Sequence, residues 1–359
     1  MARKKKTNTE EPLEEKKVQK RTTKKTVENK NEQPKVEEQP KFIDPPKFDE
    51  PVKQENVKQD LVMPRRTPTV AVLITMYNSV KTLDYCLASL NNQTVKPDQV
   101  VIVDDGSTDR SLDMARRLCP DATFVEMPTN KGIYHATFEG IHAVKCDYVM
   151  RLDSDDELTP NFIKEAKELL SQYTYDIIEF PQLRLDPGET APHDSNMNTP
   201  CDIRGVLNCL DVFFRSRLPW YFTGKLFRTE TVRMVELPNM PTSIVLDDVM
   251  FVMMLYGLAT SYVYPNTTEG YIYHFGIGSW SGKKSMTLDY YQRLVETRLI
   301  QYNVNAQFLN NIGMYEKYAN DFNKWCDFSD VFKYLGLLPL NEVGDGIVFA
   351  GKLLRLVPR

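Results

Sequence analysis

The stretch DYVMRLDSDDEL, residues 147–158, places four acidic residues directly behind an apolar run. Residues 147–153 are predicted to form a β-strand, and Asp153, Asp155, Asp156 and Glu157 lie at its end or just beyond it. Crowded carboxylates repel one another, and a bound cation removes that cost. A divalent ion held by few carboxylates and by phosphate oxygens suits Mg²⁺ or Mn²⁺. The alternative is a solvated helix N-terminus, where acidic residues are favourable.

The chain around this stretch alternates short apolar strands with helical patterns. Strands are expected at 70–75, 99–103, 122–127 and 147–153, with helices at 79–91, 112–118 and 132–144. Such alternation predicts a parallel sheet flanked by helices. Ligands of these sheets bind at the carboxyl ends of the strands. The pair Asp104-Asp105 in VDDGSTD also follows a strand, so both acidic clusters are expected on one rim; a simple Asp-Gly turn is the alternative.

A third acidic pair, Asp247-Asp248, precedes an apolar helical run. Burial beside a like charge raises the pKa of a carboxyl group and suits it to act as a general base. Capping of the helix is the alternative. The chain has neither G-x-G-x-x-G nor G-x-x-x-x-G-K-[ST], which disfavours a dehydrogenase or a P-loop NTPase and leaves a metal ion to handle phosphate charge.

The N-terminal 60 residues hold 16 Lys and Arg and 13 Asp and Glu, with few large apolar residues. Such a segment cannot bury enough surface to offset its ordering entropy, so a disordered charged tail is predicted over residues 1–66. Its basic front suggests a weak contact with a membrane or another anionic partner, and a solvated leader is the alternative. The net charge of −4 gives no general reason to expect nucleic acid.

The six cysteines form no CxxC pair, which favours a reducing compartment. The N-terminus has no apolar signal core, and the longest apolar stretch, 249–264, is too short for a confident membrane span. A cytoplasmic protein without a transmembrane segment is expected, with peripheral membrane association as the alternative.

The motifs in combination resemble those of a family 2 glycosyltransferase with the GT-A fold, over residues 69–282. The resemblance lies in TVAVLITMYN (69–78), VVIVDDGSTD (100–109), DYVMRLDSDDEL, WYFTGKLFR (220–228), LDDVMF (246–251) and YIYHFGIGSWSG (271–282). It implies an α/β, Rossmann-like, mostly parallel sheet. The implied reaction moves a sugar from a nucleotide diphosphate, often UDP, to an acceptor hydroxyl with inversion. We expect a transferase domain at 67–282, divided into a nucleotide-sugar half (67–160) and an acceptor half (161–282), and a C-terminal helical region at 283–359.

The resemblance also assigns roles to individual residues. The nucleotide-sugar side is expected to comprise Thr75, Tyr77, Asn78, Asp104, Asp105, Lys131, Asp153 and Ser154. Asp155 matches the ligand of Mn²⁺ or Mg²⁺, and His274, in the loop that in this family often closes over the diphosphate, is the second residue expected at the metal. Asp248 matches the catalytic base, with Asp247 as second choice. Trp220 and Lys225 match an element on the acceptor side.

Two departures from the family pattern affect these expectations. Thr137 and Phe138 stand where many relatives carry an Arg-Asn pair. The Q-x-x-R-W element of processive synthases is missing, which favours a single transfer. A glycan, a lipid-linked intermediate, a protein or a nucleobase are all open as the acceptor. A nucleotidyltransferase and a catalytically degenerate scaffold protein that binds nucleotide sugars are the alternative functions.

Overall fold

The computed structural model describes residues 66–194, 201–203, 209–216, 220–237, 240–242, 244, 248–277, 285–326 and 329–354. Their helices and strands occur in the order β1 (Val70–Met76), α1 (Leu83–Asn91), β2 (Gln99–Asp104), α2 (Ser111–Leu118), β3 (Thr123–Glu126), α3 (Ile133–Ala143), β4 (Tyr148–Asp153), β5 (Glu157–Leu158), α4 (Phe162–Gln172), β6 (Ile177–Glu179), β7 (Gln182–Leu185), β8 (His193–Asp194), β9 (Cys201–Ile203), α5 (Leu210–Ser216), β10 (Lys225–Arg228), α6 (Thr229–Arg233), α7 (Asp248–Leu258), β11 (Tyr262–Tyr264), β12 (Tyr271–His274), α8 (Leu288–Asn311), α9 (Tyr315–Trp325), α10 (Ser329–Tyr334), the 3₁₀ turn η1 (Leu335–Leu337) and α11 (Val343–Leu354).

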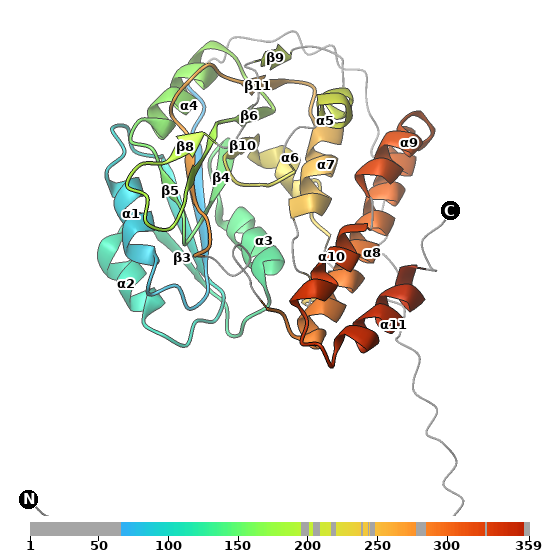
Figure 1. Cartoon of the computed structure of the whole chain (residues 1–359). Helices are drawn as coiled ribbons and strands as arrows, with labels where there is room; N and C mark the ends of the chain where they lie inside the picture. The colour runs from blue at the N-terminus through green and yellow to red at the C-terminus, as the bar shows by residue number, and fades with distance from the viewer. Residues whose placement is uncertain are drawn as a thin grey trace, which may run out of the picture. The chain divides into compact units, whose positions relative to one another are not determined.

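The main sheet has the strand order β3-β2-β1-β4-β10-β6-β11-β9. The first four strands pair in parallel, as the alternation of strands and helices predicts. Beyond β4 the sheet is mixed, because β10 runs antiparallel to both of its neighbours. The α/β fold with a mostly parallel sheet is therefore confirmed (Figure 1).

Strand β1 is buried on both faces, which explains why VAVLITM is a continuous apolar run. Ala71 and Leu73 belong to the core under α3, α7 and α8. Val70, Val72 and Ile74 belong to the core on the opposite face, with side chains of α1, α2 and α4. The alternation places helices on both faces, as Figure 1 shows.

A second, smaller sheet has the order β5-β12-β7-β8. Its first strand is only Glu157–Leu158, which begins with the last residue of the acidic cluster, and it pairs with β12. This sheet was not predicted, because strands of two to four residues carry almost no periodic signal.

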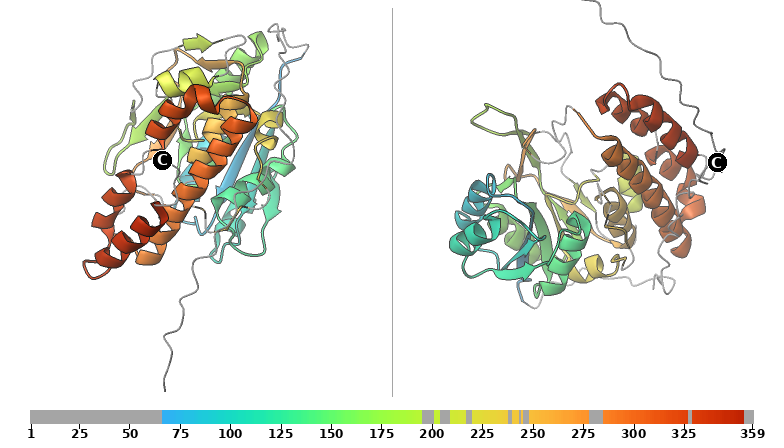
Figure 2. Two further views of the ribbon diagram at one scale, coloured as in Figure 1. Left: turned by 90° about the vertical axis from the view of Figure 1, so that its right-hand side faces the viewer. Right: turned by 90° about the horizontal axis from the view of Figure 1, so that it is seen from below.

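The C-terminal helices α8 to α11 lie on the side of α7, away from α1 and α2 (Figure 2). Gly257 of α7 lies so close to Phe308 of α8 that a Cβ atom there would meet the Phe308 ring at 2.6 Å. A separate apolar cluster joins α8 to η1 and α11 through Tyr291, Leu335 and Ala350. Across the described segments, no helix is both long enough and apolar enough to cross a membrane.

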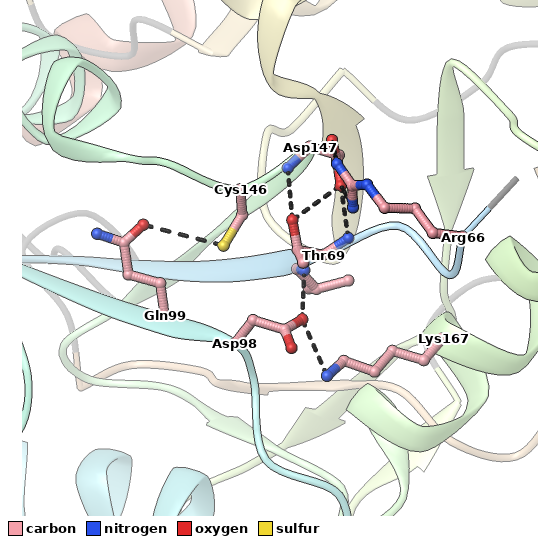
Figure 3. Close-up of polar contacts among 8 residues, drawn as sticks. Arg66, Thr69, Asp98, Gln99, Cys146, Asp147 and Lys167 are labelled. Atoms are coloured by element: carbon pink, nitrogen blue, oxygen red, sulfur yellow. Dashed lines mark hydrogen bonds and ion pairs between the residues drawn. The ribbon is translucent and has the colours of Figure 1, made fainter. Parts of the chain in front are cut away.

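The first described residues form hydrogen bonds with residues at the start of the sheet (Figure 3). Both terminal nitrogens of Arg66 donate to the Asp147 carboxylate at 2.8 Å. Thr69 donates to the same carboxylate through its backbone N–H and its hydroxyl. On the neighbouring strand connection, Asp98 accepts from the Val70 N–H and pairs with Lys167. These contacts fix the register of β1 before the chain enters the core.

Candidate active site

The carboxyl ends of three adjacent parallel strands bring two acidic motifs to one edge of the sheet. In the pairing of β1 with β2, Met76 faces Asp104. In the pairing of β1 with β4, Thr75 faces Asp153. Asp104 and Asp153 therefore flank the end of β1 on its two sides, as strand order and parallel direction require.

Arg151 joins this edge to the start of α7. Its Nε donates to Asp153 Oδ1 at 3.0 Å, and its Nη2 donates to Asp248 Oδ1 at 2.9 Å. The arginine side chain is only 3% exposed, so these charge-assisted hydrogen bonds lie out of bulk water. Arg151 therefore brings together two carboxylates that the sequence places in separate motifs.

Asp248 is held through both of its oxygens. While Oδ1 accepts from Arg151, Oδ2 accepts from the backbone N–H of Phe222 at 3.0 Å. The Arg151 guanidinium also lies 5.2 Å from the centre of the Phe222 ring. The Asp248 carboxylate therefore has a fixed orientation, and its position in the first turn of α7 suits a negative charge.

The acidic run after β4 contains carboxyl groups with altered proton affinity. Burial, and next the charge of Asp153, raise the pKa of Asp155 to about 6. Burial also raises the pKa of Asp153, although Arg151 opposes the rise. Asp156 is buried and accepts from the Tyr271 hydroxyl at 2.6 Å and the His274 N–H at 2.9 Å. Asp156 therefore supports the second sheet. The Asp155 carboxylate, in contrast, forms no ion pair with a described Lys or Arg.

His274 lies next to this acidic run. Its ring stacks on Tyr85 with 4.6 Å between the ring centres, and its Nε2 lies 3.5 Å from Glu157 Oε2. Nε2 is buried and makes no hydrogen bond with the described residues. The Tyr85 hydroxyl donates to the backbone carbonyl of Asp155 at 3.1 Å. Tyr85 thus connects His274 to the Asp155 segment.

The Asp155 carboxyl fits a divalent cation. Within the described ranges, no Lys or Arg forms an ion pair with it, and burial and the charge of Asp153 raise its pKa although the charge of Arg151 opposes the rise. The positive charge of His274 would lower that pKa. Asp155 and His274 do not form a ready-made set of three ligands. Among the described residues, a set whose ligand atoms lie within 4.8 Å of one another is Asp186, Glu189 and His193 on the β7–β8 hairpin, where Arg184 already pairs with Asp186.

Several residues predicted for the nucleotide line the loops after β1 and β2. Asn78 has a positive φ of 51°, and its side-chain oxygen accepts from the N–H groups of Thr108 and Asp109. The side-chain hydroxyls of Ser79 and Ser154 lie 2.7 Å apart, which joins the β1 loop to the acidic run. Thr75 is buried, whereas 47% of Tyr77 is exposed.

The pair Asp104-Asp105 divides into two different environments. Asp104 Oδ1 accepts from the Ser107 N–H at 3.1 Å, within its own turn. Asp105 accepts from the N–H groups of Lys131 and Gly132, at 2.7 and 2.9 Å. Asp105 therefore holds the segment that leads into α3, and the side chain of Lys131 is exposed beside it.

The acceptor-side predictions need one correction. Trp220 is 43% exposed, but Lys225 is fully buried on β10. The Lys225 ammonium lies 3.5 Å from Glu179 and donates to the Tyr221 carbonyl at 2.8 Å. A direct contact of Lys225 with an acceptor is therefore wrong for this structure, because a fully buried side chain has no free surface. Asp247, the second choice for the base, lies outside the described residues.

Sequence motifs alone assign no role to Arg151, although the local pattern carries a signal. It interrupts the apolar strand YVMRLD, and a cation buried in a central strand needs anionic partners. Asp153 two residues later is one such partner, but the second, Asp248, cannot be found from local spacing. Thr137 is also near this group, with its hydroxyl 3.4 Å from Arg151 Nη1.

The sequence is similar to those of known glycosyltransferases. Residues 71–228 match the family model described as glycosyl transferase family 2. EpsH of Bacillus subtilis strain 168, a protein named as a glycosyltransferase, is 26% identical over 72% of this chain and 74% of its own length. The cholesterol galactosyltransferase of Borreliella burgdorferi is 30% identical, over 26% of this chain and 27% of its own.

Solved structures give the same fold. S. aureus TarS 1-349 in complex with UDP aligns with a TM-score of 0.56 and 18% identity, over 81% of each chain. A complex of the same TarS fragment with UDP-GlcNAc aligns with a TM-score of 0.52 over 80% of this chain and 84% of that one. The fold is thus GT-A-like, and the protein is a glycosyltransferase. The segment that matches the family 2 glycosyltransferase model runs from β1 to the end of β10.

Proposed function

We propose that the protein transfers one sugar at a time from a nucleotide-diphosphate sugar to an acceptor hydroxyl, with inversion at the anomeric carbon. The observation that carries the proposal is the pair of hydrogen bonds from Arg151 to Asp153 and Asp248. They bring a carboxylate of the expected donor side next to the expected base. An inverting transfer requires the donor and the base to lie close together, because the acceptor must approach the sugar from the face opposite the leaving diphosphate.

The nucleotide is proposed to bind at the carboxyl ends of β1, β2 and β4. Thr75, Tyr77, Asn78 and Asp104 line this edge, and Ser154 joins it through Ser79. A carboxylate such as Asp104 is a suitable acceptor for the N–H groups of a base. A UDP-linked donor is the first candidate, since UDP and UDP-GlcNAc are the ligands named for the TarS structures.

A Mn²⁺ or Mg²⁺ ion is proposed at Asp155, with His274 beside it. The fit rests on the Asp155 carboxyl, which forms no ion pair with a described Lys or Arg, and on Nε2 of His274, which forms no hydrogen bond with a described residue. When bound, such an ion would neutralise charge on the leaving diphosphate. The backbone around the site is held by hydrogen bonds of Asp156, Tyr271 and Tyr85. The two proposed ligands are therefore positioned even without the ion.

Asp248 is proposed to accept the proton of the attacking hydroxyl. Each of its oxygens accepts a hydrogen bond from a described residue, and a carboxylate oxygen has room to accept another. Fixed orientation of a base and two substrates supplies much of the rate enhancement of such a transfer. The exposed Trp220, two residues before Phe222, is proposed to offer its ring to the acceptor.

The test combines donor hydrolysis with donor binding. A panel of nucleotide sugars with Mn²⁺ or Mg²⁺ is expected to reveal slow release of the nucleoside diphosphate from one donor. Asp248→Asn is expected to abolish transfer while donor affinity, measured by calorimetry, stays within about threefold. An equal loss of donor affinity would contradict the base assignment. A complete lack of turnover and of donor binding across the panel would contradict the transferase proposal and support a degenerate scaffold.

A further inference from the structure

Lys225 is buried where a charged side chain is costly. It faces Glu179 directly across the antiparallel pairing of β10 with β6. Both side chains are 0% exposed, and the Lys225 Nζ lies 3.5 Å from Glu179 Oε2. Buried ion pairs add little to stability compared with apolar residues of similar size. A contribution to stability therefore does not explain why this ion pair is buried.

The Glu179 carboxylate is held from several directions. It accepts from the Tyr256 hydroxyl at 3.0 Å and from the Tyr262 hydroxyl at 3.2 Å. Both tyrosines are buried, and they come from α7 and β11. Glu179 is thus a fixed anion, and it fixes the position of the Lys225 ammonium.

The Lys225 ammonium reaches back to the loop before β10. It donates to the Tyr221 carbonyl at 2.8 Å and lies 4.0 Å from the centre of the Tyr221 ring. The loop ends in Gly224, whose φ of +71° turns the chain into the strand. The Gly224 carbonyl is itself held by the Phe180 N–H at 2.8 Å.

The Tyr221 carbonyl and the Phe222 N–H belong to one peptide group. A peptide is planar, so a contact that fixes its oxygen also fixes the direction of its N–H. That N–H donates to Asp248 Oδ2 at 3.0 Å. A cation on the oxygen also polarises the peptide, which strengthens the N–H as a donor.

We infer that Lys225 is a positioning residue that orients the Tyr221–Phe222 peptide so that its N–H holds Asp248. Glu179 anchors Lys225, Lys225 holds the peptide oxygen, and the peptide N–H holds the carboxylate. The catalytic consequence rests on the proposed function, in which Asp248 is the base. The orientation of the peptide does not depend on that function and is measurable without turnover.

Three variants separate positioning from stability. Lys225→Met removes the hydrogen bond to Tyr221. Glu179→Gln is the matched control, because it removes the ion pair but keeps an amide oxygen that can accept from Lys225, whose Nζ can still donate to the Tyr221 carbonyl. The double variant Lys225→Met/Glu179→Met replaces the pair with apolar residues, which restores stability lost through an uncompensated charge.

Hydrogen exchange of the Phe222 amide is the first readout. Lys225→Met and the double variant are expected to exchange this amide at least about tenfold faster than wild type, while Glu179→Gln stays within about threefold. Equal exchange in all folded variants would overturn the inference. Should Lys225→Met fail to fold, the double variant decides in its place.

Steady-state kinetics is the second readout. With a donor that the wild type turns over, kcat is expected to fall about 10- to 100-fold in both Met variants, with KM for the donor unchanged within about threefold. A rise in the acceptor KM at constant kcat would overturn the inference in favour of a direct acceptor contact. If the wild type turns over no donor, the proposed function fails, and the exchange data still decide the role of Lys225.

Discussion

Arg151 and Asp248, 97 residues apart in the sequence, meet at 2.9 Å between the end of β4 and the start of α7. The same guanidinium holds Asp153 at 3.0 Å. One buried cation therefore serves two carboxylates with different proposed tasks, one beside the donor and one beside the acceptor.

Removal of this cation is expected to alter the pH dependence of the reaction. In Arg151→Met the guanidinium that lowers the pKa of Asp153 is lost, so that this carboxyl stays protonated to higher pH. The acid limb of the kcat profile is expected to move to higher pH, and kcat at pH 7 to fall at least about tenfold. Arg151→Lys, which keeps the charge but reaches only one carboxylate, is the matched control. An unchanged acid limb in the Met variant would refute this role.

Asp155→Asn is expected to stabilise the protein in the absence of metal. The carboxyl has a pKa of about 6 in the fold against an ordinary 3.8, so its ionisation opposes folding above pH 6. The neutral amide is expected to raise the free energy of unfolding by up to about 3 kcal/mol at pH 8. The gain shrinks as the pH falls through 6 and vanishes below about pH 4, where the wild-type carboxyl is neutral in both states.

Thermal unfolding at pH 8 and at about pH 4, with and without Mn²⁺, checks this expectation. Mn²⁺ is expected to stabilise the wild type at pH 8 and to have no effect on Asp155→Asn. A variant that is less stable than the wild type at pH 8 without metal would show that the carboxylate has a partner in the fold.

Asp104 and Asp105 are expected to separate binding from stability. Asp105→Asn replaces one carboxylate oxygen by an amide nitrogen that cannot accept from Lys131 or Gly132, so the free energy of unfolding is expected to drop by about 1–3 kcal/mol. Asp104→Asn loses at most the bond from Ser107 and is expected to weaken donor binding with little effect on urea unfolding. If Asp104→Asn lowers the free energy of unfolding and Asp105→Asn weakens donor binding, the roles of the two residues are the reverse of those expected.

Gly106 is expected to be intolerant of alanine. Its φ is +70°, and a Cβ atom would meet the backbone carbon of Thr129 at 2.7 Å. Gly106→Ala is expected to cost about 2 kcal/mol or more, because the strain of a positive φ adds to a clash with backbone. Gly313→Ala is the control, with a φ of +68° and open space around the site, and about 1 kcal/mol is expected there. If urea unfolding shows equal losses of the free energy of unfolding in the two variants, the Thr129 segment moves to accommodate the added Cβ atom.

The strands that build the nucleotide side were predictable from local pattern. VAVLITM and QVVIVD are apolar runs ended by polar turns, and in a parallel sheet their ends must share an edge. The acidic residues at those ends followed directly. The expected C-terminal helical region contains α8, a helix of 24 residues.

The contacts that cross the sheet were not predictable in this way. The pairing of Arg151 with Asp248 depends on where α7 packs, and Lys225 is buried because β10 enters the sheet between β4 and β6. A lysine near an aromatic residue suggests a surface contact until its cross-strand neighbour, Glu179, is known. Such pairings are tertiary facts with no local period or spacing.

The shared guanidinium has a consequence for an incoming anion. Asp153 and Asp248 would present two negative charges to an approaching pyrophosphate, but with Arg151 between them this spot carries a net charge of only about −1 at neutral pH. In the proposed reaction, the electrostatic barrier to binding of the donor diphosphate at this spot would therefore be lower than it would be without Arg151.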